Sequence, residues 1–430
     1  MLFAIVLAAL LAVPALPVSD ADDSEITVSS PADLIALTKL VNGGDSLAGR
    51  TVILTADLDM IGCDVLPIGL ARYAFEIDDV VAGDPVFRGT FNGCGHTISN
   101  FDIDLGTAYA DCGGGLFGTA VDASILDLTL QNCTVSGRSD LGLLIGTAKN
   151  TSINNVHAVG GSVNSTGTAS FCVGGLVGWY YTLLHDTTAT HCSSSAAVNV
   201  YAATLSQYTG GLFGAFECRA DSGDLHLSVS WATGAVTATA GTGVGGVGGL
   251  IGIGIADSGN HVTIADCYTT GVLQASAPTV TDVGGLVGSF RIQSLASSEI
   301  VSAYYAGTIK CRNAGGIYGC CENDAGNPLL LDSCRYDLGL FAGKVAAEET
   351  DYIDAFGLST AMMQSTTLAD TLNSYDGAWT QTAGSYPVLS VGTATTDNTG
   401  VLLFSLTVGT AIILCWALVL TRLLKNKEAV

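Results

Sequence analysis

Short runs in which apolar and polar residues alternate, rich in Val, Ile, Thr and Ser, dominate the chain and are separated by glycine. Successive side chains of a β-strand point to opposite faces, so a period of two predicts strands with one buried face. Helix-forming runs are sparse, and glycine contributes 54 of the 430 residues. We therefore predict an all-β fold built from short strands.

A block of the form Gly-Gly-apolar-apolar-Gly recurs along the chain and defines an internal repeat. The last glycine of each block is a structural position in this interpretation, and the seven copies, of which the second is degenerate, end at Gly118, Gly146, Gly178, Gly214, Gly252, Gly288 and Gly319. The spacings between them are 28, 32, 36, 38, 36 and 31 residues.

A second block follows within each repeat. Its aligned copies give an apolar column at Leu130, Ile153, Ala189, Leu227, Ile264, Ile300 and Leu331. Three places later comes a column of mostly small residues at Cys133, Val156, Cys192, Ser230, Cys267, Ala303 and Cys334. A β-branched strand is expected next, at Val163, Val198, Val236, Val272 and Ile309.

These repeats favour a solenoid. A single unit cannot bury its apolar face, whereas stacked neighbours bury a continuous core, and extra residues can loop out at one corner. Equivalent side chains would then form ladders about 4.8 Å apart. A β-sandwich with glycine-rich turns is the alternative, and seven copies in phase argue against it.

The motifs resemble the GLUG-motif family, named for its Gly-Leu-apolar-Gly core. Residues 54–59 (Leu-Thr-Ala-Asp-Leu-Asp), 67–69 and 87–98 are similar to the N-terminal part of such proteins, and residues 358–389 are similar to their closing segment. The resemblance implies a right-handed parallel β-helix, a secreted or surface location and adhesin-like members. The motif also occurs beside bacterial peptidase domains, but no HExxH signature is present here, so that activity is not implied.

Two apolar runs lie near the ends of the chain. Residues 2–16 followed by the small residues Ser19 and Ala21 predict a signal peptide at 1–21, with an uncleaved anchor or a buried strand as alternatives. Residues 401–421 are uncharged and long enough to cross a hydrocarbon core of about 30 Å as a helix. Basic residues follow, so we expect a type I membrane protein with a cytosolic tail at 422–430, rather than a GPI anchor.

The expected organisation is a signal peptide at 1–21, an N-terminal cap with the first coils at 22–110, and GLUG-type repeats at 111–345. A closing segment and stalk at 346–400, the membrane helix at 401–421 and the tail complete the chain. The net charge of −24 argues against nucleic acid as a partner. Three sequons, at Asn132, Asn150 and Asn164, are candidate glycosylation sites.

Thirteen cysteines are present, of which Cys415 lies in the predicted membrane helix. Cys133, Cys192, Cys267 and Cys334 occupy one column in alternate repeats, about 10 Å apart, which exceeds the reach of a disulfide. We predict buried free thiols there. An exported chain favours bridges elsewhere, and the candidates are Cys63, Cys94, Cys112, Cys172, Cys218, Cys311, Cys320 and Cys321.

Paired carboxylates are the candidate catalytic or calcium-binding groups, at Asp57/Asp59, Asp78/Asp79 and Asp102/Asp104. Outward residues of a solvated strand near the N-terminal cap are the stronger explanation of these pairs. The six histidines are scattered without metal-ligand spacing. We therefore expect no catalytic site, no cofactor and no metal.

We predict an extracellular surface protein, anchored in the membrane by one helix, that acts as an adhesin-like display or binding solenoid. Glycans and host-cell surface proteins are the candidate partners. The adjacent aromatics Trp179–Tyr180–Tyr181 and Tyr304–Tyr305 could stack on sugars, although such residues more often cap loops or pack. A carbohydrate-active β-helix enzyme, either a lyase or a hydrolase, is the alternative, and a purely structural spacer is a third possibility.

Overall fold

The computed structural model describes residues 24–72, 83–219, 223–293, 295–311, 313–323, 329–347, 354–373 and 379–390. The predicted signal peptide, the membrane run 401–421, the tail, Asp78/Asp79 and Cys415 lie outside these residues. No helix within the described ranges is long and apolar enough to cross a bilayer.

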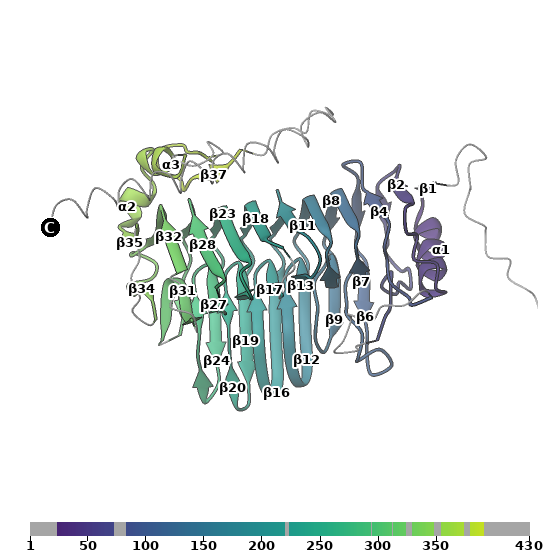
Figure 1. The fold of residues 1–430 in the computed structure, drawn as a ribbon, viewed down its shortest axis with the longest axis horizontal. Coiled ribbons are helices and arrows are strands. Elements are labelled where there is room, and N and C mark those ends of the chain that lie inside the picture. Colours follow the sequence, from purple (N-terminus) through teal and green to yellow (C-terminus); the bar gives the residue numbers. More distant parts are fainter. Residues whose placement is uncertain are drawn as a thin grey trace, which may run out of the picture. The chain divides into compact units, whose positions relative to one another are not determined.

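Two large sheets of parallel strands form the molecule, and the chain alternates between them coil by coil (Figure 1). This pairing is consistent with the predicted β-helix. The first sheet, here called sheet A, contains β1 (Glu25–Val28), β2 (Thr51–Leu54), β3 (Leu58–Asp59), β4 (Thr90–Asn92), β5 (Thr97–Ser99), β8 (Ser124–Gln131), β11 (Ser152–Val159), β14 (Thr187–Thr190), β15 (Ser193–Ser194), β18 (Leu225–Ala232), β23 (His261–Thr269), β28 (Ser297–Val301), β29 (Tyr304–Tyr305), β32 (Leu329–Asp332), β33 (Cys334–Asp337) and β35 (Ala355–Leu358).

Sheet B contains the remaining parallel strands: β6 (Asp102–Asp104), β7 (Phe117–Val121), β9 (Thr134–Gly137), β10 (Ile145–Lys149), β12 (Ser162–Gly174), β13 (Val177–Thr182), β16 (Ala197–Gly210), β17 (Phe213–Cys218), β19 (Val236–Ala240), β20 (Gly243–Val244), β21 (Val247–Gly248), β22 (Ile251–Ala256), β24 (Leu273–Ser276), β25 (Thr279–Val280), β26 (Val283–Gly284), β27 (Val287–Ile292), β30 (Ile309–Lys310), β31 (Ala314–Asn323) and β34 (Lys344–Ala346).

The glycine-ended blocks stack in register, which confirms the predicted repeat. The apolar residue before each final glycine pairs with its equivalent in the next coil, along Phe117, Ile145, Val177, Phe213, Ile251, Val287 and Tyr318. Glycine is needed here because backbones approach closely. A Cβ at Gly252 would lie 2.5 Å from both the Gly214 carbonyl oxygen and the Thr209 nitrogen.

The second block also forms a ladder, but the prediction placed one coil wrongly. Ile153 pairs with Ile125, and Val156 pairs with Leu128, so Leu130 and Cys133 do not belong to these columns. Leu130 instead pairs with Ala158 and Ile98 in the neighbouring ladder. The pairs Ile125/Leu128 and Leu130/Cys133 have the same spacing, so the sequence alone allowed both alignments.

The third column needs a smaller correction. Val163, Val198, Val236 and Ile309 are inward, as expected, but Leu273 and not Val272 pairs with Val236. Val272 is 36% exposed and Leu273 is fully buried.

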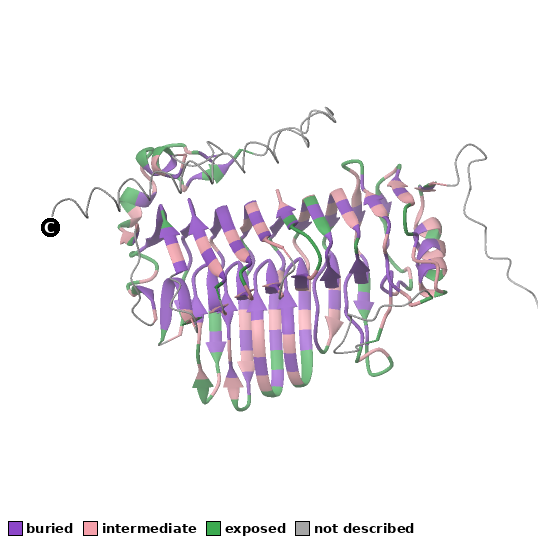
Figure 2. Ribbon diagram, viewed as in Figure 1, coloured by how far each residue is buried: buried purple, intermediate pink, exposed green. Residues whose placement is uncertain are grey.

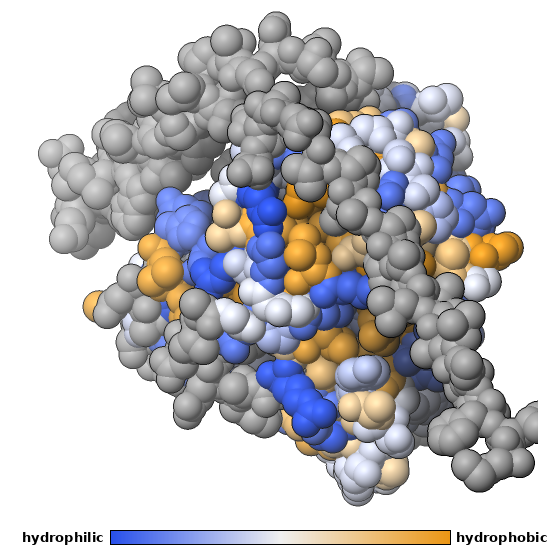
Figure 3. Space-filling model, turned by 90° about the vertical axis from the view of Figure 1, so that its right-hand side faces the viewer, coloured by the Kyte–Doolittle hydropathy of each residue, from blue (hydrophilic) through white to orange (hydrophobic). Residues whose placement is uncertain are grey.

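A short helix covers the first coil. In α1 (Pro31–Asn42), Ser30 is the N-cap, with its side chain accepting from the Asp33 backbone N–H, and Pro31 opens the first turn. Leu34, Leu37, Thr38 and Val41 are buried. Figure 3 views the molecule from this side, where hydrophobic and hydrophilic residues lie side by side.

The closing segment, residues 359–390, folds back over sheet A. It contains α2 (Thr360–Met363), α3 (Thr367–Leu372), β36 (Trp379–Thr380) and β37 (Val388–Leu389), the last two paired antiparallel. Trp379 and Leu372 pack with Tyr268 and Tyr304 of the sheet in a separate apolar cluster.

Candidate functional site

Among the predicted carboxylate pairs, Asp57 bonds to the next coil, and Asp59 bonds both locally and to the next coil. Asp57 accepts a hydrogen bond from the Thr97 backbone N–H at 2.9 Å, and its Oδ1 lies 3.1 Å from His96 Nδ1. The hydrogen bond from Thr97 is the main cause that lowers the pKa of Asp57. Asp59 accepts from the Ile61 N–H and from Asn100 Nδ2. Asp102 and Asp104 are exposed on β6.

The aromatic pairs proposed to stack on sugars are largely internal. Tyr180, Tyr181, Tyr304 and Tyr305 are each at most 1% exposed, which excludes them as a platform in this fold. Only Trp179 reaches the surface in part, where its Nε1 donates to Glu217 Oε2 at 2.9 Å. The alternative that these residues pack is the one the structure shows, and the buried hydroxyl of Tyr180 is satisfied by donating to the Thr151 carbonyl.

An aromatic ladder runs along the outer face of sheet A and is used internally. The rings of Trp231, Tyr268 and Tyr304 stack with centroids 5.9 and 5.2 Å apart. His157 approaches Trp231 at 5.7 Å, so both faces of the indole ring have ring neighbours. Trp379 of the closing segment packs on Tyr268 and Tyr304. The ladder therefore holds the closing segment in place.

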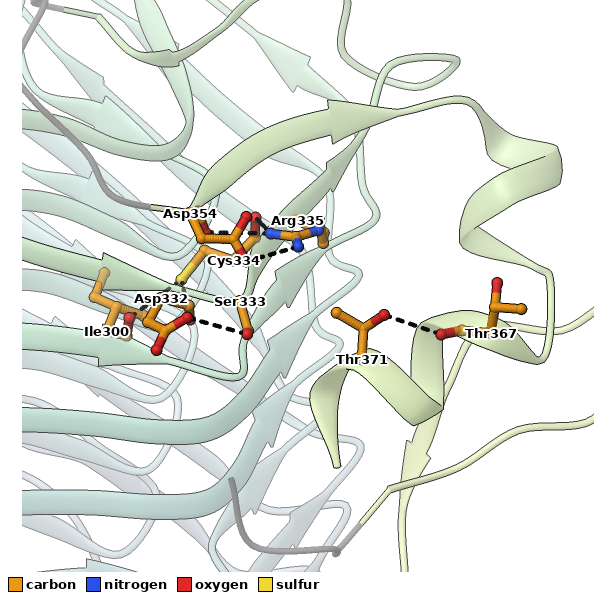
Figure 4. A network of polar contacts seen from close by, with 8 residues as sticks. All are labelled: Ile300, Asp332, Ser333, Cys334, Arg335, Asp354, Thr367 and Thr371. Carbon is orange, nitrogen blue, oxygen red and sulfur yellow. Dashed lines mark hydrogen bonds and ion pairs between the residues drawn. The ribbon is translucent and has the colours of Figure 1, made fainter. Parts of the chain in front are cut away.

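A small pocket lies where the closing segment meets the last coils (Figure 4). Its volume is about 180 Å³, and it is lined by Arg335, Phe356, Leu358, Met362, Thr367, Leu368 and Thr371. The Arg335 guanidinium pairs with Asp354 at 2.9 Å and lies 4.0 Å from the Phe356 ring centroid. Ligand pockets usually enclose about 300–1,000 Å³, and this arginine is already neutralised, so we assign the pocket a structural role.

Three of the four column thiols lie where the prediction placed them. Cys192, Cys267 and Cys334 alternate along one ladder with Ser230 and Ala303, are fully buried and donate to backbone carbonyls. Each is therefore about 10 Å from the next, which is too far for a bridge. Cys133 is buried at a different corner, where its Sγ donates to the Gln131 carbonyl.

The predicted bridges are not formed. All twelve cysteines in the described part of the chain are free thiols, including the eight bridge candidates. Cys320 and Cys321 are neighbours on β31 and pair with Ser289 and Phe290 of β27, so their side chains point to opposite faces. No group of three or more His, Cys, Asp or Glu that could hold a metal occurs within the described ranges.

The three sequons differ in accessibility. Asn132 is exposed. Asn150 is 2% exposed, and its amide bonds to Asp122, Thr182 and the Leu183 N–H, so this folded site is closed to a glycan. Asn164 is half-buried on β12 of sheet B.

In four consecutive coils the strands of sheet B continue into a two-legged projection, here called the fin, at residues 162–174, 197–210, 236–248 and 273–284. The long strands β12 and β16 and the shorter strands β19 and β24 mark it in Figure 1. In the first coil Ser165 Oγ lies 2.7 Å from Ser170 Oγ, so the chain doubles back between them. The inward side chains are small, as at Val200, Ala238 and Ala275.

The first leg of each fin coil presents two outward residues, and together they form a grid of two rows, here called the fin grid. The register aligns one row as Asn164, Asn199, Thr237 and Gln274, and the other as Thr166, Tyr201, Thr239 and Ser276. Buried and accessible positions alternate along these strands (Figure 2). Tyr201 is the aromatic residue of the grid, and it is 53% exposed.

The fin grid is uncharged within an acidic chain. The eight grid residues contain no Asp, Glu, Lys or Arg, and the fin as a whole contains one charged residue, Asp282, although the whole chain carries 39 acidic and 15 basic residues. Charged residues lie only beyond the two ends of the first row. At one end Asn164 pairs with Ser136, which in turn pairs with Asp104, and at the other end Gln274 pairs with Lys310. The structure thus brings the predicted residue Asp104 to the border of the grid, and leaves Asp57 and Asp59 on sheet A.

Comparison with known proteins gives limited likenesses. No protein-family model matches the chain, so the GLUG resemblance stays a prediction. Over 177 residues the chain is 34% identical to Halomucin of Haloquadratum walsbyi, a match that covers 40% of this chain and 2% of Halomucin. The chain therefore spans a very small part of that relative.

Two solved structures match part of the chain at low sequence identity. A candidate immunoglobulin A1 protease from Bacteroides ovatus is 15% identical, with a TM-score of 0.48, and the match covers 86% of this chain and 93% of that one. A structure named IgA1 Protease is 17% identical, with a TM-score of 0.42, covering 72% of this chain and 21% of that one.

Proposed function

We propose that this chain is an extracellular surface protein that binds its partners through the flank of a non-catalytic, right-handed parallel β-helix of the GLUG type. In this proposal residues 1–21 direct export, and the helix of residues 401–421 holds the protein in the membrane as an adhesin-like display. The observation that carries the binding role is the fin grid, an ordered and uncharged face on a strongly acidic chain.

The fin grid has the properties of a recognition surface. Its side chains come from strands and not from loops, so their spacing is set by backbone pairing, and sites on such elements are held more precisely than sites on loops. The identity with Halomucin supports a surface location, because a mucin is by name a secreted or surface glycoprotein. The backbone hydrogen bonds that Asp57 accepts from the next coil and Asp59 accepts from Ile61 support a structural role for those carboxylates.

The test uses the full chain produced in cells. Externally added protease should cleave the ectodomain of intact cells, and labelled glycans and host-cell proteins should bind at the cell surface and be lost in a Tyr201→Ala variant. Export without any ligand that depends on the fin would refute the binding role. Polysaccharide depolymerisation by the purified chain would refute the absence of catalysis and favour the enzyme alternative.

A further inference from the structure

We propose that the fin grid binds a neutral glycan chain, with Tyr201 beneath one sugar ring. This inference rests on the proposed binding role of the fin and names its class of ligand. Three properties of the grid support it: its lack of charge, its size, and the fixed orientation of two of its amides.

The charge pattern selects a neutral ligand. An anionic polymer would be repelled by the surface of a chain with a net charge of −24. A cationic ligand would find no carboxylate among the eight grid residues, because the nearest acidic position in the first row, Asp104, lies two coils from Asn164. Neutral hydroxyl-bearing ligands meet neither penalty.

The size of the grid favours a glycan over a protein. Four coils span three spacings of about 4.8 Å, and two outward residues on a strand lie about 7 Å apart, so the grid measures roughly 14 by 7 Å. A stable protein interface buries about 800 Å² on each partner and centres on several large aromatic or arginine anchors. The grid offers one such anchor, Tyr201, and an area suited to a few sugar units.

The polar groups of the grid are oriented before a ligand arrives. Asn199 Nδ2 donates to Asn164 Oδ1 at 3.0 Å, and Asn164 Nδ2 donates to Ser162 Oγ at 3.0 Å. This chain of hydrogen bonds fixes both amides. Amides and hydroxyls both donate and accept, as sugar hydroxyls require. Tyr201 adds a rigid ring with few rotatable bonds, so little side-chain entropy is lost on binding.

The test measures binding of defined polysaccharides to the full chain, purified in detergent from a bacterial host so that Asn164 stays unglycosylated. The neutral probes are dextran, laminarin and mannan, and the anionic probes are polygalacturonate and hyaluronate. Ser276→Glu adds a charge to an exposed grid position on β24. Its matched control, Thr188→Glu, adds the same charge to an exposed position on β14 of sheet A.

We expect at least one neutral probe to bind, and binding to weaken about tenfold or more in both Tyr201→Ala and Ser276→Glu but not in Thr188→Glu. Unchanged thermal unfolding of the variants would show that they remain folded. Preference for an anionic probe would overturn the inference. So would a protein ligand that needs Tyr201 while no glycan binds, although that result would leave the proposed function intact. Loss of binding in the Thr188→Glu control would also overturn it.

Discussion

A column of residues in the left-handed conformation bends sheet A at one corner of seven successive coils. Asp127, Asn155, His191, Val229, Asp266, Ser302 and Ser333 all have φ between 49° and 54°. Asn and Asp tolerate this region better than most residues, and Asn155 also donates to Asp127 Oδ1 at 2.8 Å. The bend explains why inward residues are three apart across this corner, as in Ile264 and Cys267, and not two.

Ser302 is a weak point of this column. Its φ is 52°, and its buried hydroxyl has no hydrogen-bond partner within the described residues. Ser302→Gly should raise the free energy of unfolding by about 1 kcal/mol, because it relieves both the backbone strain and the unpaired hydroxyl. Thermal or urea unfolding measures this, and Ser302→Ala separates the two effects by removing only the hydroxyl. A lower stability of the glycine variant would contradict the argument.

Thiol reactivity should follow burial. Burial is the main cause that raises the pKa of Cys133 to about 11 and of Cys192 to about 12, whereas Cys94 is exposed. Only thiolate reacts with disulfide reagents. In the folded protein at pH 8 we therefore expect Cys94 to react first, and the buried column only on unfolding. Cys94→Ser should remove the fast phase of the titration; equal rates for native and unfolded protein would refute the buried column.

Sequence patterns located most strands, and the places where they failed can be traced to single residues. The glycine blocks allowed the register between coils to be predicted, because the backbones approach so closely at these positions that only glycine fits. The shortest repeat, of 28 residues, was misaligned because two apolar pairs with the same spacing lie five residues apart. Tyr201 was missed although its position was readable: inward Val198, Val200 and Ala202 force it outward by strand alternation.

At the scale of single strands, the glycines of the repeat control packing between coils. Gly252→Ala should destabilise the protein by about 3 kcal/mol, because its Cβ would meet backbone atoms at 2.5 Å that cannot move independently. Gly243→Ala is the matched control on the fin, where the nearest atom is the end of the Leu205 side chain at 3.3 Å. Chemical denaturation of the two variants compares them, and similar stabilities would refute the role of close approach.

The closing segment is attached through few polar contacts. Trp379 Nε1 donates to Asp266 Oδ1 at 2.8 Å, and Tyr304 donates to the Pro387 carbonyl at 2.6 Å. Trp379→Phe keeps most of the apolar contact but leaves the buried Asp266 carboxylate without this donor, at a cost of about 1–3 kcal/mol. We expect faster hydrogen exchange in residues 359–373 with unchanged exchange in β11. Uniform acceleration throughout the solenoid would contradict a local role.

For the whole molecule, the acidic surface sets the response to salt. Like charges repel in the compact state when the net charge is −24. Among the described residues, ion pairs such as Arg50–Asp45, Arg88–Asp122 and Arg291–Glu322 are partly exposed, and such pairs each contribute about 0–1 kcal/mol. Screening of the repulsion should therefore prevail, and the melting temperature should rise between 0.01 and 0.5 M NaCl, where the Debye length falls from about 30 Å to a few Å. Isomolar sucrose is the control for osmolyte effects, and a fall in melting temperature with salt would contradict this balance.

The in-register fin has a consequence for how such a chain can change over generations. Each fin coil begins and ends at equivalent corners of the solenoid. Duplication of the gene segment for one coil would therefore add one pair of outward residues to the fin grid and leave the neighbouring coils intact. Each added pair of residues would contact a further stretch of the ligand, so binding strength could increase with each duplication. Variation in repeat number between related strains would be the visible trace of this process.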